Sequence, residues 1–105
     1  MASADWKIKP ASAQAEKQWN KAKEKEPDLM AKEKERLENR PLERGDNPGR
    51  THKLRGPLST RMVGRVRYDQ WQHEISSAGR VWYCVDRKNR IVWITQVSLG
   101  HPKDT

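Results

Sequence analysis

The sequence predicts a small α+β protein in which an N-terminal strand and a helical hairpin pack on a small antiparallel sheet. Two observations support this fold class. Segments rich in helix-forming residues fill the first half of the chain, and apolar, strand-like segments fill the second half. A chain of 105 residues has room for one domain, so residues 1–105 are expected to fold as a single unit.

Apolar residues are scarce but concentrated. Leu, Ile, Val and Phe together number 16, and charged residues make up 34% of the chain, which is a composition that disordered proteins also have. Ten of these 16 residues lie between residues 63 and 99, together with three tryptophans and both tyrosines. A small hydrophobic core can therefore form in this region.

The N-terminal half, residues 1–49, is expected to begin with a strand and a helix. Residues 6–9 alternate apolar and polar side chains before a proline, as a short strand does. Residues 12–25 are rich in helix formers, and Ser12 is the expected N-cap.

A second helix is expected over residues 28–40. Pro27 suits the first position of a helix, and Pro41 ends the pattern. Both helices have narrow apolar faces, so they need another layer on which to dock.

The second half of the chain contains three segments with strand character. Residues 71–75 alternate apolar and polar side chains, while residues 80–86 and 91–99 are more continuously apolar. Short polar turns separate them, so we expect an antiparallel meander over residues 71–99. The preceding basic stretch, residues 61–67, fits either a weak strand or an extended arm.

Several classes of protein are excluded. The single cysteine, Cys84, cannot form an internal disulfide or a cysteine-based zinc cluster. The longest apolar run, residues 81–85, is too short to span a membrane, and the first ten residues lack the apolar segment of a secretory signal. We therefore expect a cytoplasmic protein without metal or other cofactor.

The charge is distributed unevenly along the chain. Residues 1–49 carry 11 Lys and Arg against 10 Asp and Glu, whereas residues 50–105 carry 11 against 4. The surplus of +7 in the second half suggests an anionic partner such as a nucleic acid, although solubility alone can also explain it.

Four segments resemble one family. They are Lys53-Leu54-Arg55-Gly56, Trp71 at the start of a strand, Arg80-Val81-Trp82-Tyr83-Cys84-Val85-Asp86, and Val97-Ser98-Leu99-Gly100-His101. In this order, after a strand and a helical hairpin, they resemble the RelE/ParE superfamily, the toxins of type II toxin–antitoxin modules. The resemblance covers nearly the whole chain and implies a RelE-like fold and a cognate antitoxin as partner.

The resemblance also implies an activity, because most members cleave mRNA on the ribosome. Such cleavage needs a base for the 2′-hydroxyl, an acid for the leaving 5′-oxygen and a cation for the phosphorane. The resemblance assigns Arg80 to the phosphorane and His101 to the leaving oxygen. His73 is the expected base, or Glu74 if the strand faces the other way. The expected RNA-binding residues are His52, Lys53, Arg55, Arg61, Arg65, Arg67 and Lys103.

Two other functions stay open. The ParE-like branch inhibits DNA gyrase without cleaving RNA, and a basic nucleic-acid-binding module without catalysis also fits the charge. Departures from the family include Gln72 and Glu74 where lysine-rich members carry two lysines, and Ser77 where histidine-dependent members carry Asp.

Trp71, Trp82 and Trp93 lie on three successive expected strands. They can offer a stacking surface for bases. Their position within strands favours a role in the core or in helix docking.

Overall fold

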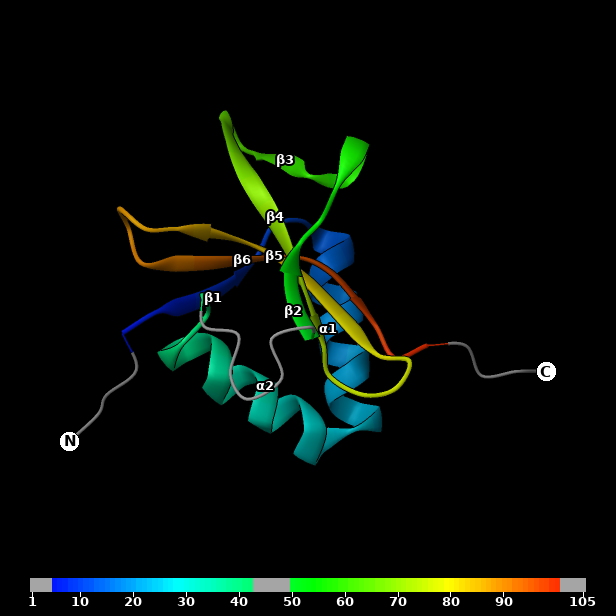
Figure 1. The fold of residues 1–105 in the computed structure, drawn as a ribbon. Coiled ribbons are helices and arrows are strands. Elements are labelled where there is room, and N and C mark those ends of the chain that lie inside the picture. The colour runs from blue at the N-terminus through cyan, green and yellow to red at the C-terminus, as the bar shows by residue number, and fades with distance from the viewer. Residues whose placement is uncertain (1–4, 43–49, 101–105) are drawn as a thin grey trace.

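The computed structural model describes residues 5–42 and 50–100. Two helices pack on one face of a mixed sheet, which confirms the predicted α+β class (Figure 1). The elements in chain order are β1 (Lys7–Pro10), α1 (Ala13–Lys25), α2 (Pro27–Asn39), β2 (Thr51–Lys53), a 3₁₀ turn (Gly56–Leu58), β3 (Thr60–Val63), β4 (Val66–Glu74), β5 (Arg80–Asp86) and β6 (Ile91–Ser98).

The strand order is β1-β6-β5-β4-β2, and β3 also pairs with β4. Strands β4, β5 and β6 pair antiparallel, as the expected meander over residues 71–99 requires. β1 runs parallel to β6, so the sheet is mixed and not antiparallel throughout. Alternation in the sequence indicates a strand but carries no information about its direction or partner.

The basic stretch over residues 61–67 belongs to a hairpin and is not an extended arm. β4 begins at Val66, earlier than expected, and β3 pairs with its first half. Val63 and Val66 flank a two-residue turn that starts at Gly64, whose φ of 62° suits glycine. The hairpin projects away from the helices (Figure 1).

The helices begin where the sequence predicts. The Ser12 hydroxyl accepts a hydrogen bond from the Ala15 N–H at 3.1 Å, and α2 begins at Pro27. Neither helix in the described ranges is long and apolar enough to cross a membrane.

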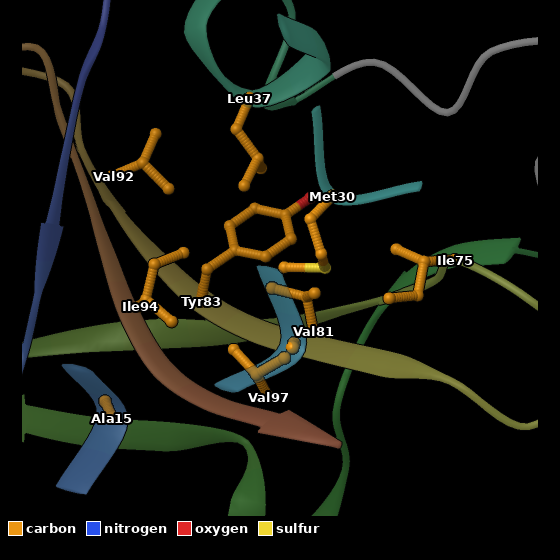
Figure 2. Close-up of a cluster of buried hydrophobic side chains, with 10 residues drawn as sticks. Ala15, Met30, Leu37, Ile75, Val81, Tyr83, Val92, Ile94 and Val97 are labelled. Atoms are coloured by element: carbon orange, nitrogen blue, oxygen red, sulfur yellow. The ribbon is translucent and has the colours of Figure 1, made fainter. Parts of the chain in front are cut away.

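The core lies between the helices and the sheet. The Tyr83 ring, which is fully buried, sits among apolar side chains from α2 and from its neighbouring strands (Figure 2). The buried apolar side chains of the cluster are Ala15, Ala22, Met30, Leu37, Ile75, Val81, Tyr83, Val92, Ile94 and Val97. This burial holds two helices that could not persist alone.

Candidate active site

The face of the sheet opposite the helices is called the open face here. Val81 and Tyr83 point into the core, so Arg80 and Trp82, which alternate with them, point the other way. The strand register places further side chains of β2, β4 and β6 on this face. Around Arg80 the open face therefore carries His52, Gln72, Glu74, Arg80, Trp82, Gln96 and Ser98. Further along the same face lie Tyr68, Gln70, Cys84, Asp86 and Trp93.

The open face brings together two of the predicted catalytic residues. Glu74 and Arg80 are direct Cα partners across β4 and β5, and directly opposed residues have their Cβ atoms about 5 Å apart. One guanidinium nitrogen of Arg80, Nη1, donates to the Gly79 carbonyl at 3.0 Å and to the Ser76 carbonyl at 3.5 Å. These bonds hold one terminal nitrogen of the guanidinium against the turn, and the other nitrogens have further N–H donors for an anion.

A row of polar and aromatic side chains crosses the open face beside this pair. His52 is the Cα partner of Gln72, and Gln72 is the partner of Trp82. The indole Nε1–H of Trp82 donates to the Gln72 side-chain oxygen at 2.8 Å. His52, one of the predicted RNA-binding residues, therefore shares a face with Glu74 and Arg80.

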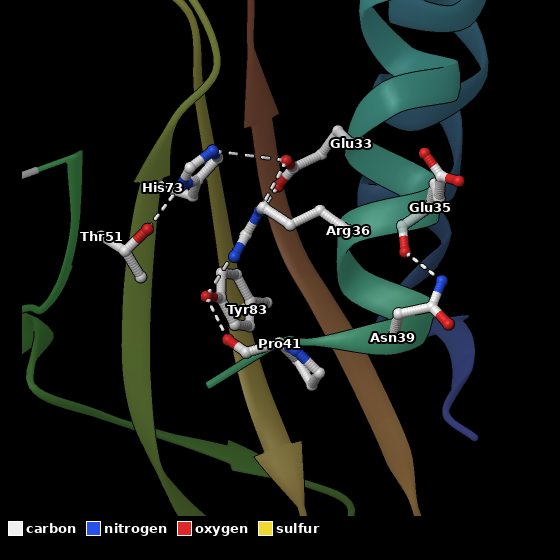
Figure 3. Close-up of polar contacts among 8 residues, drawn as sticks. All are labelled: Glu33, Glu35, Arg36, Asn39, Pro41, Thr51, His73 and Tyr83. Carbon is white, nitrogen blue, oxygen red and sulfur yellow. Dashed lines mark hydrogen bonds and ion pairs between the residues drawn. The ribbon is translucent and has the colours of Figure 1, made fainter. Parts of the chain in front are cut away.

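His73 lies on the other face, against α2, so the structure does not bring it together with Arg80 (Figure 3). Its Nδ1 lies 2.6 Å from the Thr51 hydroxyl, and its Nε2 lies 3.5 Å from Glu33. Burial, aided by the positive charges of Arg36 and Arg50, lowers the pKa of His73 to about 4. The imidazole is therefore uncharged at neutral pH. Glu74 replaces His73 as the side chain of β4 that faces Arg80.

The contacts of His73 extend into a buried polar network that sequence reasoning missed (Figure 3). Arg36 donates to both carboxylate oxygens of Glu33, at 3.0 and 3.1 Å. It also donates to the Tyr83 hydroxyl at 3.3 Å, which in turn donates to the Pro41 carbonyl at 2.8 Å. Burial raises the pKa of the Glu33 carboxyl, and the bonds from Arg36 oppose that rise.

A signal for this network was present in the sequence. Glu33 lies three residues after Met30 and four before Leu37, and both of these side chains are buried. A charged residue at helical spacing between two core residues faces the core too. Glu33 is only 3% exposed, so the mixed charge of this helix is not entirely a solvated surface.

The predicted basic residues do not form one continuous surface. Lys53 pairs with Asp69 at 3.2 Å, on the helix-facing side of the sheet. Arg61 and Arg67 point to opposite faces of the β3–β4 hairpin, because Arg61 is the partner of Tyr68 and Met62 is the partner of Arg67. The exposed residues of the set are Lys53, Arg55, Arg61, Arg65 and Arg67.

Two predicted site residues, His101 and Lys103, lie outside the described residues. The strand that leads toward them, β6, ends at Ser98, which is the Cα partner of Arg80.

Neither a metal cluster nor a reactive thiol is found in the described part of the chain. No group of three His, Cys, Asp or Glu side chains within residues 5–42 and 50–100 gathers to hold a metal ion. Cys84 is buried, and burial raises the pKa of its thiol to about 11. It is therefore protonated at neutral pH and suits a small core residue.

Comparisons with known proteins identify the fold. No family model matches the chain, and no curated protein matches it significantly in sequence. A chain of the archaeal RelE–RelB complex from Pyrococcus horikoshii has a similar structure, with a TM-score of 0.61 and 18% identity over 90% of this chain and 93% of that chain. A chain of the toxin–antitoxin complex RelBE2 from Mycobacterium tuberculosis matches with a TM-score of 0.55 and 18% identity, over 90% of this chain and 96% of that one. The chain therefore has the RelE-like fold that its resemblance to the RelE/ParE superfamily implies.

Proposed function

We propose that this protein is the toxin of a type II toxin–antitoxin module and cleaves mRNA on the ribosome. The observation that carries the proposal is the cross-strand pair of Glu74 and Arg80 on the open face of the sheet. The two solved structures with the same fold come from complexes described as RelE–RelB and as a toxin–antitoxin complex, which supports a cognate antitoxin as a partner of this chain.

The proposed reaction is an attack of the 2′-hydroxyl on the adjacent phosphorus. Glu74 takes the hydroxyl proton while the new O–P bond forms. Arg80 stabilises the additional negative charge on the phosphorane oxygens through its planar fork. The bond to the 5′-oxygen then breaks, and His101 supplies the proton that this leaving oxygen takes up. The products are a cyclic phosphate and a free 5′-hydroxyl, and no water is consumed.

The charge of the second half supports RNA as the substrate. The exposed arginines of the β3–β4 hairpin, Arg61, Arg65 and Arg67, can contact phosphates along the strand on either side of the cleavage point. Of these, Arg61 points to the same side as the open face, because its partner Tyr68 lies an even number of residues before Gln72 and Glu74 on β4 and so shares their face.

The test uses purified protein, ribosomes and a defined mRNA, with cleavage read by primer extension. Arg80→Ala is expected to lower the cleavage rate by about 10²–10³. Arg87→Ala is the matched control, because it removes one positive charge from an exposed turn beyond the other end of β5 and should cut like the parent.

Two outcomes would overturn the proposal. If Arg80→Ala cuts as fast as Arg87→Ala, the site is wrong. If the parent cuts no mRNA but blocks DNA supercoiling by gyrase, the protein is a gyrase inhibitor instead. The same supercoiling assay, run on the parent and both variants, separates these cases.

A further inference from the structure

Trp82 and Trp93 differ from the other three tryptophans in their surroundings, and only Trp82 has a hydrogen-bond partner for its indole N–H among the described residues. Trp6, Trp19 and Trp71 pack against the hydrophobic core. Trp82 is neither in that core nor packed against it in the described part of the chain, and its side chain is half-buried on the open face. Its partners across the neighbouring strands are Gln72 and Gln96, both polar. Packing between helix and sheet therefore does not explain the Trp82 side chain.

The Trp82 ring is held in place by its one polar atom. The Nε1–H donates to Gln72 Oε1 at 2.8 Å, across the β4–β5 pair. The indole N–H therefore already has an acceptor within the sheet. The apolar face of the ring is fixed in orientation before a ligand binds. A side chain fixed before binding loses little conformational entropy when a ligand stacks on it.

The neighbours of Trp82 select the chemistry of that ligand. Arg80 lies two residues earlier on the same strand and face, roughly 6.6 Å away at the usual rise of a strand. His52 lies in the same row, beyond Gln72. A cation that holds a phosphate beside a fixed aromatic ring is the arrangement that binds single-stranded nucleic acid through its backbone and one base.

We propose that Trp82 and Gln72 form a base-binding subsite of the open face. One unpaired base of single-stranded RNA stacks on the Trp82 indole while an adjoining phosphate is held by Arg80. Gln72 is a positioning residue, because it holds the Trp82 indole in place and does not itself contact the base. This inference rests on the proposed function, since it takes the RNA at Arg80 to be the substrate.

The test measures binding without cleavage. The full chain is titrated into a fluorescein-labelled single-stranded oligonucleotide whose 2′-oxygens are methylated, so that no 2′-hydroxyl can attack. Stacking on an aromatic residue contributes about 1–3 kcal/mol per base, so Trp82→Leu should bind roughly 5- to 150-fold more weakly. Trp82→Phe keeps an aromatic ring and should lose only a few-fold. Trp71→Leu, a change of the same side chain on the helix-facing side, should leave the affinity of the folded protein unchanged.

A scan with abasic nucleotides separates stacking from a structural role. Removing the base that stacks on Trp82 should weaken binding by the parent as much as Trp82→Leu does. The same removal should have little further effect on Trp82→Leu, because the two changes break one contact. If Trp82→Leu does not fold, as judged by circular dichroism, the same coupling is measured with Trp82→Phe, where it should be partial and confined to the same base.

The outcomes distinguish this subsite from the catalytic proposal. Equal affinity of parent and Trp82→Leu, or a loss that is coupled to no single base, overturns the subsite. So does a loss of affinity for the antitoxin with RNA binding unchanged, which would make Trp82 a protein contact. If ribosome-bound mRNA is not cut but the coupling is found, the base-binding subsite holds and the proposed activity fails.

Discussion

Strands β4 and β5 present similar polar chemistry on two faces with opposite surroundings. On the helix-facing side, His73 lies against Thr51 and Glu33 and is held by groups of the protein itself. On the open face, Glu74 and Arg80 lie in register, and both helices of the described residues pack on the opposite face. Polar groups that satisfy each other in the core stabilise one conformation, whereas groups on an uncovered face remain available to a ligand. Changes to one face should therefore affect stability, and changes to the other should affect activity.

The largest expected effect is on the open face and concerns rate. Glu74→Ala should lower mRNA cleavage by about 10²–10⁴, because it removes the proposed base. The free energy of unfolding, measured in urea, should stay within about 0.5 kcal/mol of the parent. Glu35→Ala, an exposed carboxylate on α2, is the matched control for charge. Normal cleavage by Glu74→Ala would remove Glu74 from the site.

The opposite result is expected for Glu33, the buried carboxylate of the helix-facing side. Glu33→Ala should lower the free energy of unfolding by about 3–5 kcal/mol, because it leaves the Arg36 guanidinium partly buried without its ion-pair partner. The double variant Glu33→Leu with Arg36→Met should recover much of that loss, since apolar side chains of similar size can replace a buried ion pair. A loss from Glu33→Ala no larger than that from Glu35→Ala would mean that the network contributes little.

The comparison also shows how far the sequence determines the site. The alternation of Trp71, His73 and Ile75 with Gln70, Gln72 and Glu74 places His73 on the apolar side of its strand and Glu74 on the polar side. The resemblance to known toxins favoured His73 as the base, but the alternation already indicated that it lies on the apolar side of the strand, away from Glu74. The helix starts could be predicted from Ser12 and Pro27. The meander could be predicted from the apolar segments of the second half and the short polar turns between them.

Other features depend on tertiary packing and were beyond the sequence. The parallel pairing of β1 with β6 joins segments far apart in the chain, and no local pattern specifies it. The strand β2 has only three residues, which is too short for a distinctive alternation. The contact between Arg36 and Tyr83 joins residues 47 positions apart, and no spacing rule links them. The base-binding role proposed for Trp82 needs the same information, because only the docking of the helices decides which tryptophans pack against the core.

Acid should weaken the fold through His73. Its pKa is lowered to about 4 from an ordinary 6.5, so between these values the unfolded chain binds a proton that the folded chain does not. The free energy of unfolding should therefore fall as the pH drops through this window, by up to about 3 kcal/mol. Urea midpoints are compared for the parent and for His73→Gln, which keeps polar contacts but does not titrate. Carboxyl groups contribute to both profiles, so the difference isolates His73, and parallel profiles would contradict the prediction.

The smallest effects come from removing one hydroxyl oxygen on each face. The Tyr83 hydroxyl lies in the core, donates to the Pro41 carbonyl and accepts from Arg36, so Tyr83→Phe leaves two polar groups of the interior without that partner. The expected loss in the free energy of unfolding is about 1–3 kcal/mol. The Tyr68 hydroxyl donates to Asp86 at 3.2 Å, on the other face of the sheet, and Asp86 keeps two hydrogen bonds from Asn89. Tyr68→Phe should therefore cost less than about 1 kcal/mol. Chemical denaturation of the two variants in parallel compares the same atomic change in both surroundings. Equal losses of unfolding free energy in Tyr83→Phe and Tyr68→Phe would contradict this prediction. They would mean that a hydroxyl on the helix-facing side contributes no more to stability than one on the open face.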